Sequence, residues 1–325
     1  MAEPERDEIS RDPRRGGWRR VALALGIVCA LAALTTAWLL RDPTPYFLGR
    51  RSTLAHVDTV SASGDSLSAD LQLRLRAAND FAVLVAVRRP AAPPAPGARR
   101  RLFVILGGQR AGKEAALLFP DTRGSVVAAI EYPYGGKPNP KGLAVVREVP
   151  AIRRAILDTP PAIMLALDYL LQQPDVDPTR IELIGASFGA PFAAVVAALD
   201  QRVTRLWLLH GAADPRRLLE HNLRRYVSIA PLRTAIAATA NVLISGPRLD
   251  PAHWTPRVSP RPVILINALE DERIPRPLVD ALFASAREPK EQHWLPGQHM
   301  QRNRREILTA LVDTVMALAQ RDSAR

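Results

Sequence analysis

Cysteine is almost absent from the sequence: Cys29 is the only one among 325 residues. One cysteine cannot form an internal disulfide, and it excludes a zinc site built from several cysteines. Lysine is also scarce, because 40 of the 44 basic residues are arginine. Abundant arginine, alanine and proline together indicate a compositional bias of the whole chain. The sequence carries no zinc-finger, RNA-recognition or basic-zipper pattern, so the net charge of +12 does not predict a nucleic-acid partner.

The chain does contain enough apolar residues to fold. Hydrophobic residues make up 47% of the sequence, which excludes wholesale disorder. A length of 325 residues allows one large domain or two small ones with a sizeable core.

Residues 21–40 form a long uncharged apolar run. Twenty helical residues span about 30 Å, the thickness of the hydrocarbon core of a bilayer. Tryptophans stand near both ends, at Trp18 and Trp38, where indole rings favour the membrane interface. The basic residues lie mostly before the run, at Arg14, Arg15, Arg19 and Arg20. This asymmetry predicts a single-pass anchor in the lipid bilayer, with a cytoplasmic N-terminus and the remaining chain in the periplasm or outside the cell.

A cleaved signal peptide is the alternative to an anchor, since Thr35-Thr36-Ala37 resembles a cleavage site of small residues. The apolar region of a signal peptide usually has only about 7–15 residues, which favours the uncleaved anchor. The predicted organisation is a basic tail over residues 1–20, the anchor over 21–40, a polar spacer over 41–53 and one folded domain over 54–325. Secretion after cleavage remains open.

Within residues 54–325, apolar runs alternate with helical segments. Strands are predicted over 67–75, 81–87, 102–108, 125–133, 181–187, 205–211, 262–267 and 290–295. Helices are predicted over 114–119, 162–172, 191–199, 277–286 and 305–319. Short apolar strands separated by helices favour an α/β fold with a mostly parallel sheet flanked by helices. Residues 212–260 interrupt this rhythm and are predicted to form a helical cap over the strand ends.

The strongest local signal is Gly185-Ala186-Ser187-Phe188-Gly189, which matches the nucleophile-elbow pattern between a strand and a helix. A serine on such a tight turn projects its hydroxyl above the sheet. Gly185 and Gly189 keep side chains out of the space that the turn needs. The N-terminus of the next helix points at the serine and favours developing negative charge. Ser187 is therefore the predicted nucleophile.

Residues 177–189 (DPTRIELIGASFG) resemble the α/β-hydrolase fold, especially its dienelactone-hydrolase-like and prolyl-oligopeptidase-like branches. The resemblance covers about residues 54–325 and implies a nucleophile, an acid and a histidine in that order. Asp271 matches the acid loop of the family, because it follows a late strand and precedes Ile274-Pro275. His299 matches the family's base, because it follows a glycine loop before the last helix.

Other residues compete for these two roles. Glu270 and Glu272 flank Asp271, and Asp214 follows an earlier strand at a position that some members of the family use. The five remaining histidines are interpreted as structural or peripheral: His56, His210, His221, His253 and His293.

An oxyanion hole completes the predicted site. The residue after the nucleophile, Phe188, supplies one backbone N–H. The resemblance implies the second donor at Gln109, although Gly107 stands where the family often has a histidine. Together these residues predict a membrane-anchored serine hydrolase that cleaves carboxylic esters of a small-molecule acyl substrate through an acyl-enzyme, without metal or cofactor. A serine peptidase, an acyltransferase or a non-catalytic binding protein of the same fold are the alternatives.

Overall fold

The structure is a computed structural model that describes residues 13–39, 41–108, 111–119, 121–137 and 142–321. The chain divides into two compact units, residues 1–41 and 42–325. The first unit contains helix α1 (Pro13–Leu39). Its segment Arg20–Trp38 has a mean hydropathy of 2.2 and is long and apolar enough to cross a membrane, as the sequence predicts for this region.

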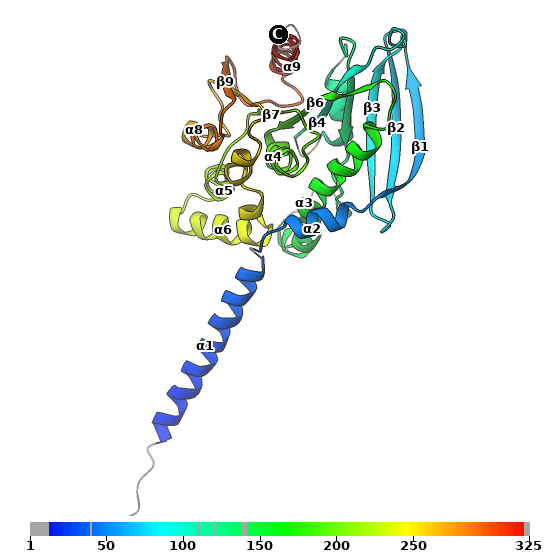
Figure 1. Cartoon of the computed structure of the whole chain (residues 1–325). Coiled ribbons are helices and arrows are strands. Elements are labelled where there is room, and N and C mark those ends of the chain that lie inside the picture. Colours follow the sequence, from blue (N-terminus) through cyan, green and yellow to red (C-terminus); the bar gives the residue numbers. More distant parts are fainter. Residues whose placement is uncertain (1–12, 40, 109–110, 120, 138–141, 322–325) are drawn as a thin grey trace, which may run out of the picture. The chain divides into compact units, whose positions relative to one another are not determined.

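The second unit is built on one nine-stranded sheet, in the order β1-β2-β3-β5-β4-β6-β7-β8-β9. The strands are β1 (Leu54–Gly64), β2 (Ser68–Ala77), β3 (Ala82–Pro90), β4 (Arg100–Leu106), β5 (Val126–Ile130), β6 (Val176–Ala186), β7 (Arg205–Leu209), β8 (Val263–Ala268) and β9 (Lys290–Leu295). Strands β1, β2 and β3 are antiparallel, and β3 also runs antiparallel to β5. From β5 to β9 every pair is parallel, which confirms the predicted mostly parallel sheet (Figure 1).

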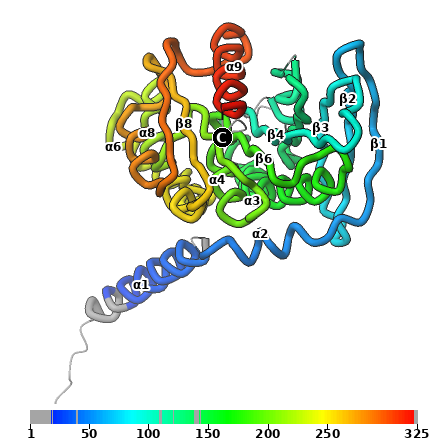
Figure 2. The backbone as a smooth tube through the Cα atoms, turned by 45° about the horizontal axis from the view of Figure 1, so that its top comes forward, coloured from blue at the N-terminus to red at the C-terminus, as the bar shows by residue number. Residues whose placement is uncertain are grey.

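Helices cover both faces of this sheet. The α-helices are α2 (Thr44–Arg51), α3 (Leu143–Leu170), α4 (Ala190–Leu199), α5 (Pro215–Leu223), α6 (Ala230–Leu243), α7 (Pro251–Trp254), α8 (Arg276–Ser285) and α9 (Arg305–Arg321). Short 3-10 turns are η1 (Gly112–Leu118), η2 (Ser187–Gly189), η3 (Gly246–Leu249) and η4 (Thr255–Arg257). Helices α3 and α4 pack against one face, and α9 with η1 packs against the other (Figure 2).

The central strands alternate their side chains between two buried layers. Leu102, Val104 and Leu106 of β4 enter the core under α3 and α4, whereas Phe103 and Ile105 enter the core under α9. Successive strand residues point to opposite faces, so a strand covered on both sides must be apolar throughout. This explains why the strands appear in the sequence as short continuous apolar runs.

Residues 41–53 differ from the predicted polar spacer. They contain α2, which docks on α3 with the ring of Phe47 fully buried. Tyr46 and Arg50 both hydrogen bond to the carboxylate of Asp158, and Arg51 pairs with Asp168. Burial, followed by the bond to Asp158, raises the pKa of Tyr46 to about 12, so this hydroxyl keeps its hydrogen. The charged residues of this segment pair with acids more than 100 residues away in the chain. The sequence alone therefore shows only a polar stretch, and not its docking.

The helical insertion lies between β7 and β8, in the stretch predicted as a cap. It comprises α5, α6, η3, α7 and η4, and α5 packs beside α6 (Figure 1). Side chains of α5 and η3 face a cavity that also contains Ser187. The insertion therefore forms one wall of the space above the serine.

Candidate active site

Ser187 stands at the sharp turn where β6 ends and α4 begins. Its φ is 51°, the left-handed region that side chains other than glycine rarely adopt. A Cβ at Gly185 would lie 2.6 Å from the Cβ of Ala193, and one at Gly189 would lie 2.2 Å from the carbonyl oxygen of Leu106. Both neighbouring positions therefore require glycine for space, which is the reason for their spacing around Ser187.

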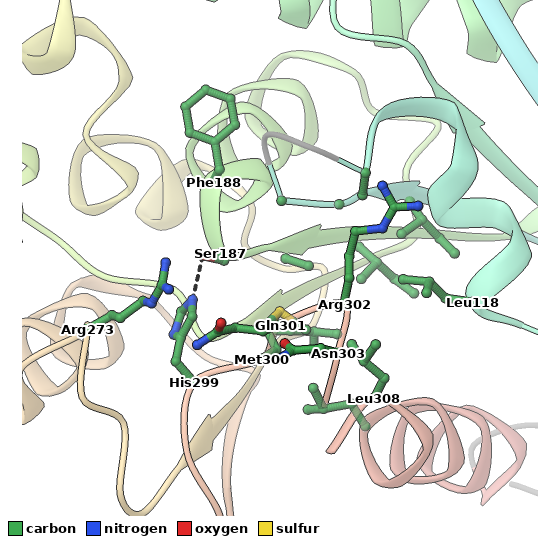
Figure 3. A pocket seen from close by; sticks show the side chains of 18 of the residues that line it. Leu118, Ser187, Phe188, Arg273, His299, Met300, Gln301, Arg302, Asn303 and Leu308 are labelled. Carbon is green, nitrogen blue, oxygen red and sulfur yellow. Dashed lines mark hydrogen bonds between the residues drawn. The ribbon is translucent and has the colours of Figure 1, made fainter. Parts of the chain in front are cut away.

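His299 lies beside this serine. It follows β9 on the loop before α9, and its side chain is nearly fully buried. Its Nε2 is 2.8 Å from the Oγ of Ser187 (Figure 3). A neutral imidazole in this position can accept the hydroxyl hydrogen. The loop between β9 and α9 thus brings together two residues that lie 112 positions apart in the chain.

Asp271 holds the other side of the histidine ring. Its Oδ2 is 2.8 Å from Nδ1 of His299, and its Oδ1 accepts the backbone N–H groups of Arg273 and Ile274, each at 2.9 Å. Burial raises the pKa of Asp271, but the hydrogen bonds from His210 and His299 outweigh it, so the net shift is downward. Asp271 is therefore ionised at neutral pH and orients the ring of His299.

The three competing acids make other contacts. Glu272 accepts the backbone N–H of His299 at 2.9 Å and also binds Arg304. Glu270 accepts the backbone N–H of Gly297, and Asp214 caps α5 by accepting the N–H of Arg217 at 2.9 Å. Glu272 and Glu270 thus brace the loop that carries His299, whereas Asp271 contacts the imidazole itself.

A second histidine, His210, reaches the same carboxylate. It follows β7 with a φ of 51° and is 1% exposed. Its Nδ1 is 2.9 Å from the Oδ2 of Asp271, and its ring meets that of His299 edge to face at 5.1 Å between centroids. The sequence alone predicts a structural or peripheral role for His210. The sequence does contain one signal for its contact with Asp271. His210 follows one strand and Asp271 follows the next, and the carboxyl ends of neighbouring parallel strands lie at the same edge of a sheet.

Solved structures with similar architecture include several esterases and an α/β hydrolase. An acetyl xylan esterase from Thermoanaerobacterium sp. JW/SL YS485 superposes with a TM-score of 0.62 over 86% of this chain and 93% of that chain. An acetyl xylan esterase from Paenibacillus sp. R4 gives 0.59 over 86% and 94%. The chain has the α/β-hydrolase fold. The sequence identities are 15% and 19%, so these likenesses concern the fold.

No family model matches the chain. A curated relative from Salmonella typhi, the uncharacterized protein YfhR, is 32% identical over 142 residues, and the match covers 42% of this chain. The chain spans about half the length of the curated relatives that it matches, 45% for this one. The two esterase structures described above, and not this partial sequence match, confirm the α/β-hydrolase fold predicted from residues 177–189.

The sequence predicts that the backbone N–H of Phe188, the residue after Ser187, is one donor to a developing oxyanion. The predicted second donor, Gln109, lies outside the described residues.

The loop before residue 109 is held by Tyr132, whose hydroxyl donates to the carbonyl oxygen of Gly107. Burial, followed by the charge of Glu131, raises the pKa of Tyr132, so the hydroxyl retains the hydrogen it donates. The rings of Tyr132, Phe188 and Phe192 also pack together.

Two cavities meet at Ser187. One, of about 750 Å³, extends from the loop after β4 to the start of α9. The other, of about 350 Å³, extends under the helical insertion and is mostly apolar. Ser187, Phe188, Asn222, Arg273 and His299 line both. The guanidinium of Arg273 points towards the space beside Ser187 and His299 (Figure 3). Two cavities on either side of one hydroxyl suit a substrate with an acyl part and a leaving part.

Among the described residues, one group of His, Asp, Glu or Cys side chains has ligand atoms close enough for a metal ion: His210, Asp271 and His299. Their nitrogen–oxygen distances of 2.8 and 2.9 Å are those of direct hydrogen bonds. The atoms that a metal would need are therefore bonded to one another, and the group fits a proton-handling role.

Proposed function

We propose that this protein is a serine hydrolase that cleaves carboxylic esters, with Ser187 as nucleophile, His299 as base and Asp271 as the orienting acid. One observation carries the proposal: a serine at φ 51° lies 2.8 Å from a histidine that lies 2.8 Å from a buried carboxylate. The positions of these residues after β6, β8 and β9 of an α/β-hydrolase fold support the assignment. The esterases with similar structure support an ester substrate.

The chemistry follows from the hydrogen bonds. Nε2 of His299 accepts the proton of Ser187 as the serine oxygen attacks the ester carbonyl carbon. The resulting oxyanion is stabilised by the N–H of Phe188, with Gln109 as the proposed second donor. His299 then returns the proton to the leaving alkoxide, which departs as the alcohol. Water, deprotonated by His299, cleaves the acyl-enzyme and releases the carboxylic acid. Asp271 stays ionised throughout and stabilises the imidazolium.

The cavities limit the substrate to small or slender esters. The 350 Å³ cavity is bounded by apolar side chains, among them Phe192, Leu218 and Leu249. Such a lining favours an apolar acyl chain over a charged or peptide-like group. The larger cavity carries Arg225 and Arg302, which the smaller one lacks, and suits the more polar leaving alcohol.

Activity-based labelling tests this function. The wild-type protein is expected to react with a fluorophosphonate probe and to hydrolyse p-nitrophenyl acetate. Ser187→Ala removes the attacking oxygen, so labelling should vanish and kcat should fall by a factor of about 10⁴ or more. Ser61→Ala, on the exposed strand β1, is the matched control and should behave as wild type.

Two results would overturn the proposal: equal labelling of Ser187→Ala, or a folded wild-type protein that the probe does not label. The second result would favour a binding protein of this fold. An amide and acyl-acceptor panel distinguishes the remaining alternatives. Amide cleavage at rates comparable to those of esters would indicate a peptidase, and transfer to an alcohol in preference to water would indicate an acyltransferase.

We further propose that residues 20–38 anchor the enzyme in a membrane, with the hydrolase unit in the periplasm or outside the cell. The length and hydropathy of Arg20–Trp38 support the anchor, and the arginines in the N-terminal part of α1 support this orientation. The N-terminal mass of the mature protein tests the anchor, because cleavage after Ala37 would remove it. An intact N-terminus in the membrane fraction is the expected result.

A further inference from the structure

The outer face of helix α6 is apolar. Leu232, Ile236 and Leu243 are exposed on it, and Tyr226 and Ile229 are exposed just before the helix. Tyr226 is 83% exposed, Ile229 61% and Leu232 49%. We call these five residues the α6 apolar face. The opposite side of the helix, including Ala237 and Asn241, is buried against the unit.

This arrangement is the reverse of that in an ordinary surface helix. Residues 232, 236 and 243 are separated by four and seven positions and therefore share one face of α6, with Ile229 at its N-cap. The side turned to solvent normally carries charged or polar groups. Here the other exposed positions from Ile229 to Leu243 are Ala230, Pro231, Ala235 and Thr239, and Arg233 is the single charged residue in α6. A contiguous exposed apolar face of this kind marks an interaction surface.

Basic residues outnumber acidic ones in the sequence around the α6 apolar face. Helices α5 and α6 with their connection carry five arginines and one acidic residue: Arg216, Arg217, Arg224, Arg225, Arg233 and Glu220. Arg224 and Arg225 are exposed directly beside Tyr226. An apolar face with an aromatic residue and flanking arginines is typical of helices that lie in the interface of an anionic membrane.

The start of the hydrolase unit lies near this surface. Asp42 is the first residue of the unit and follows the apolar segment of α1 by a few residues. Helix α2 begins two residues later at Thr44, and its Phe47 ring lies 6.5 Å, centroid to centroid, from the ring of Trp254, whose Nε1 donates to the carbonyl oxygen of Arg248 at 2.8 Å. Arg248 belongs to η3, the turn that directly follows α6. The chain therefore enters the unit beside the C-terminal end of α6.

We propose that the α6 apolar face docks on the anionic surface of the lipid bilayer that α1 spans. This inference rests on the proposed anchor and deepens the proposed function. Tyr226 of the α6 apolar face and the adjacent Arg225 also line the 750 Å³ cavity that contains Ser187. The active-site opening then lies at the membrane surface, and the substrate class is an apolar acyl ester dissolved in the bilayer.

Site-specific fluorescence tests the docking without relying on activity. Because Cys29 is the only cysteine, Cys29→Ser gives a full-length protein in which Leu232→Cys carries a single environment-sensitive label. The protein is reconstituted in vesicles of phosphatidylcholine and phosphatidylglycerol. The label at 232 should be quenched by a lipid-attached nitroxide and protected from iodide. Val60→Cys, an equally exposed apolar position on the edge strand β1, is the control and should respond to iodide alone.

A label at 232 that responds as the label at 60 does would overturn the docking. Protection from iodide without quenching by the lipid nitroxide would also overturn it, because that result indicates a second copy of the chain as the occupant. Insertion of the label in a protein without esterase activity would leave the docking intact and refute the proposed function. The two failures are thus distinguishable.

Kinetics on two substrates test the consequence for catalysis. Leu232→Glu with Ile236→Glu should reduce hydrolysis of a long-chain ester embedded in vesicles about tenfold or more, since burial of even one such side chain changes a partition constant by that factor. The kcat/KM for soluble p-nitrophenyl acetate should stay at the wild-type value. An equal loss on both substrates, or no loss on either, would refute delivery of substrate from the bilayer.

Discussion

At the scale of single residues, the buried oxygen Oδ2 of Asp271 serves two histidines, at 2.8 Å from His299 and 2.9 Å from His210. An ionised carboxylate only accepts hydrogen bonds, so each ring nitrogen that faces it carries a hydrogen. Two donors from different loops fix the direction of this oxygen more firmly than one donor does. We therefore expect His210 to act as a positioning residue that works through Asp271.

Replacement of His210 tests this role. His210→Phe removes a hydrogen bond to a charged group, which is worth about 1.5–3 kcal/mol, and should lower kcat about tenfold to a hundredfold. His210→Asn keeps an N–H donor and should recover part of the loss. Steady-state kinetics on p-nitrophenyl acetate with both variants is the measurement. Equal activity of the Phe variant and the wild type would refute the role.

The free energy of unfolding should also depend on the protonation of His210. Burial lowers the pKa of His210 below its ordinary 6.5. The charge of His299 acts in the same direction, whereas Asp271 and Glu272 oppose it. The unfolded chain then binds more protons than the folded one below about pH 6.5, so stability declines as the pH falls from 6.5 towards the lowered pKa. Asp271, with its pKa lowered, contributes a separate loss only below about pH 4.

Urea unfolding at pH 7.5 and pH 5 measures this effect. The free energy of unfolding of the wild type should fall between the two values, and that of His210→Phe should fall less because the titrating group is gone. An identical decrease in both proteins would assign the pH dependence to other groups.

At the scale of elements, helix α2 is a polar segment that ion pairs and one buried ring hold against α3. Phe47 packs 6.5 Å from the ring of Trp254, and Arg50, Tyr46 and Asp158 form one hydrogen-bonded group beside it. Phe47→Ala should lower the free energy of unfolding by about 3–5 kcal/mol, as for other buried aromatic side chains. Leu48→Ala, on the exposed side of the same helix, should cost far less. Chemical denaturation of both variants makes the comparison.

Helix α3 illustrates a limit of local pattern. The sequence predicts a helix only from residue 162, since Pro160 and Pro161 interrupt the pattern, yet the helix runs through them and through Pro150 from Leu143. Proline removes one backbone hydrogen bond, but burial of residues such as Ile163, Leu165 and Leu167 against the sheet outweighs that loss. The gain depends on contacts with distant strands, which periodicity does not reveal.

At the scale of the whole molecule, the core, both cavities and all described site residues belong to residues 42–325. A protein of residues 42–325 should therefore fold and react with the fluorophosphonate probe without α1. A protein of residues 54–325 lacks α2 and should melt at a lower temperature. Circular dichroism melting and probe labelling of both proteins are the measurements; a melting temperature unchanged by loss of α2 would contradict its role in the unit.

The sequence by itself determined the fold class, the apolar N-terminal segment and the elbow at Ser187. These depend on neighbours in the chain: continuous apolar runs, uncharged length, and glycines two residues from a serine. It also pointed to Asp271 and His299 through a family pattern, and the structure places both in one hydrogen-bonded chain with Ser187.

Only the tertiary structure decided which carboxylate of Glu270-Asp271-Glu272 faces the imidazole. The backbone N–H groups of Arg273 and Ile274 turn Asp271 inward, while Glu272 binds the backbone of His299. Only the pairing of β7 with β8 brings His210 to Asp271, and only the packing of α6 leaves its apolar side outward. The contacts of Glu272 with His299 and of His210 with Asp271 join residues far apart in the chain, so no short stretch of sequence contains both partners.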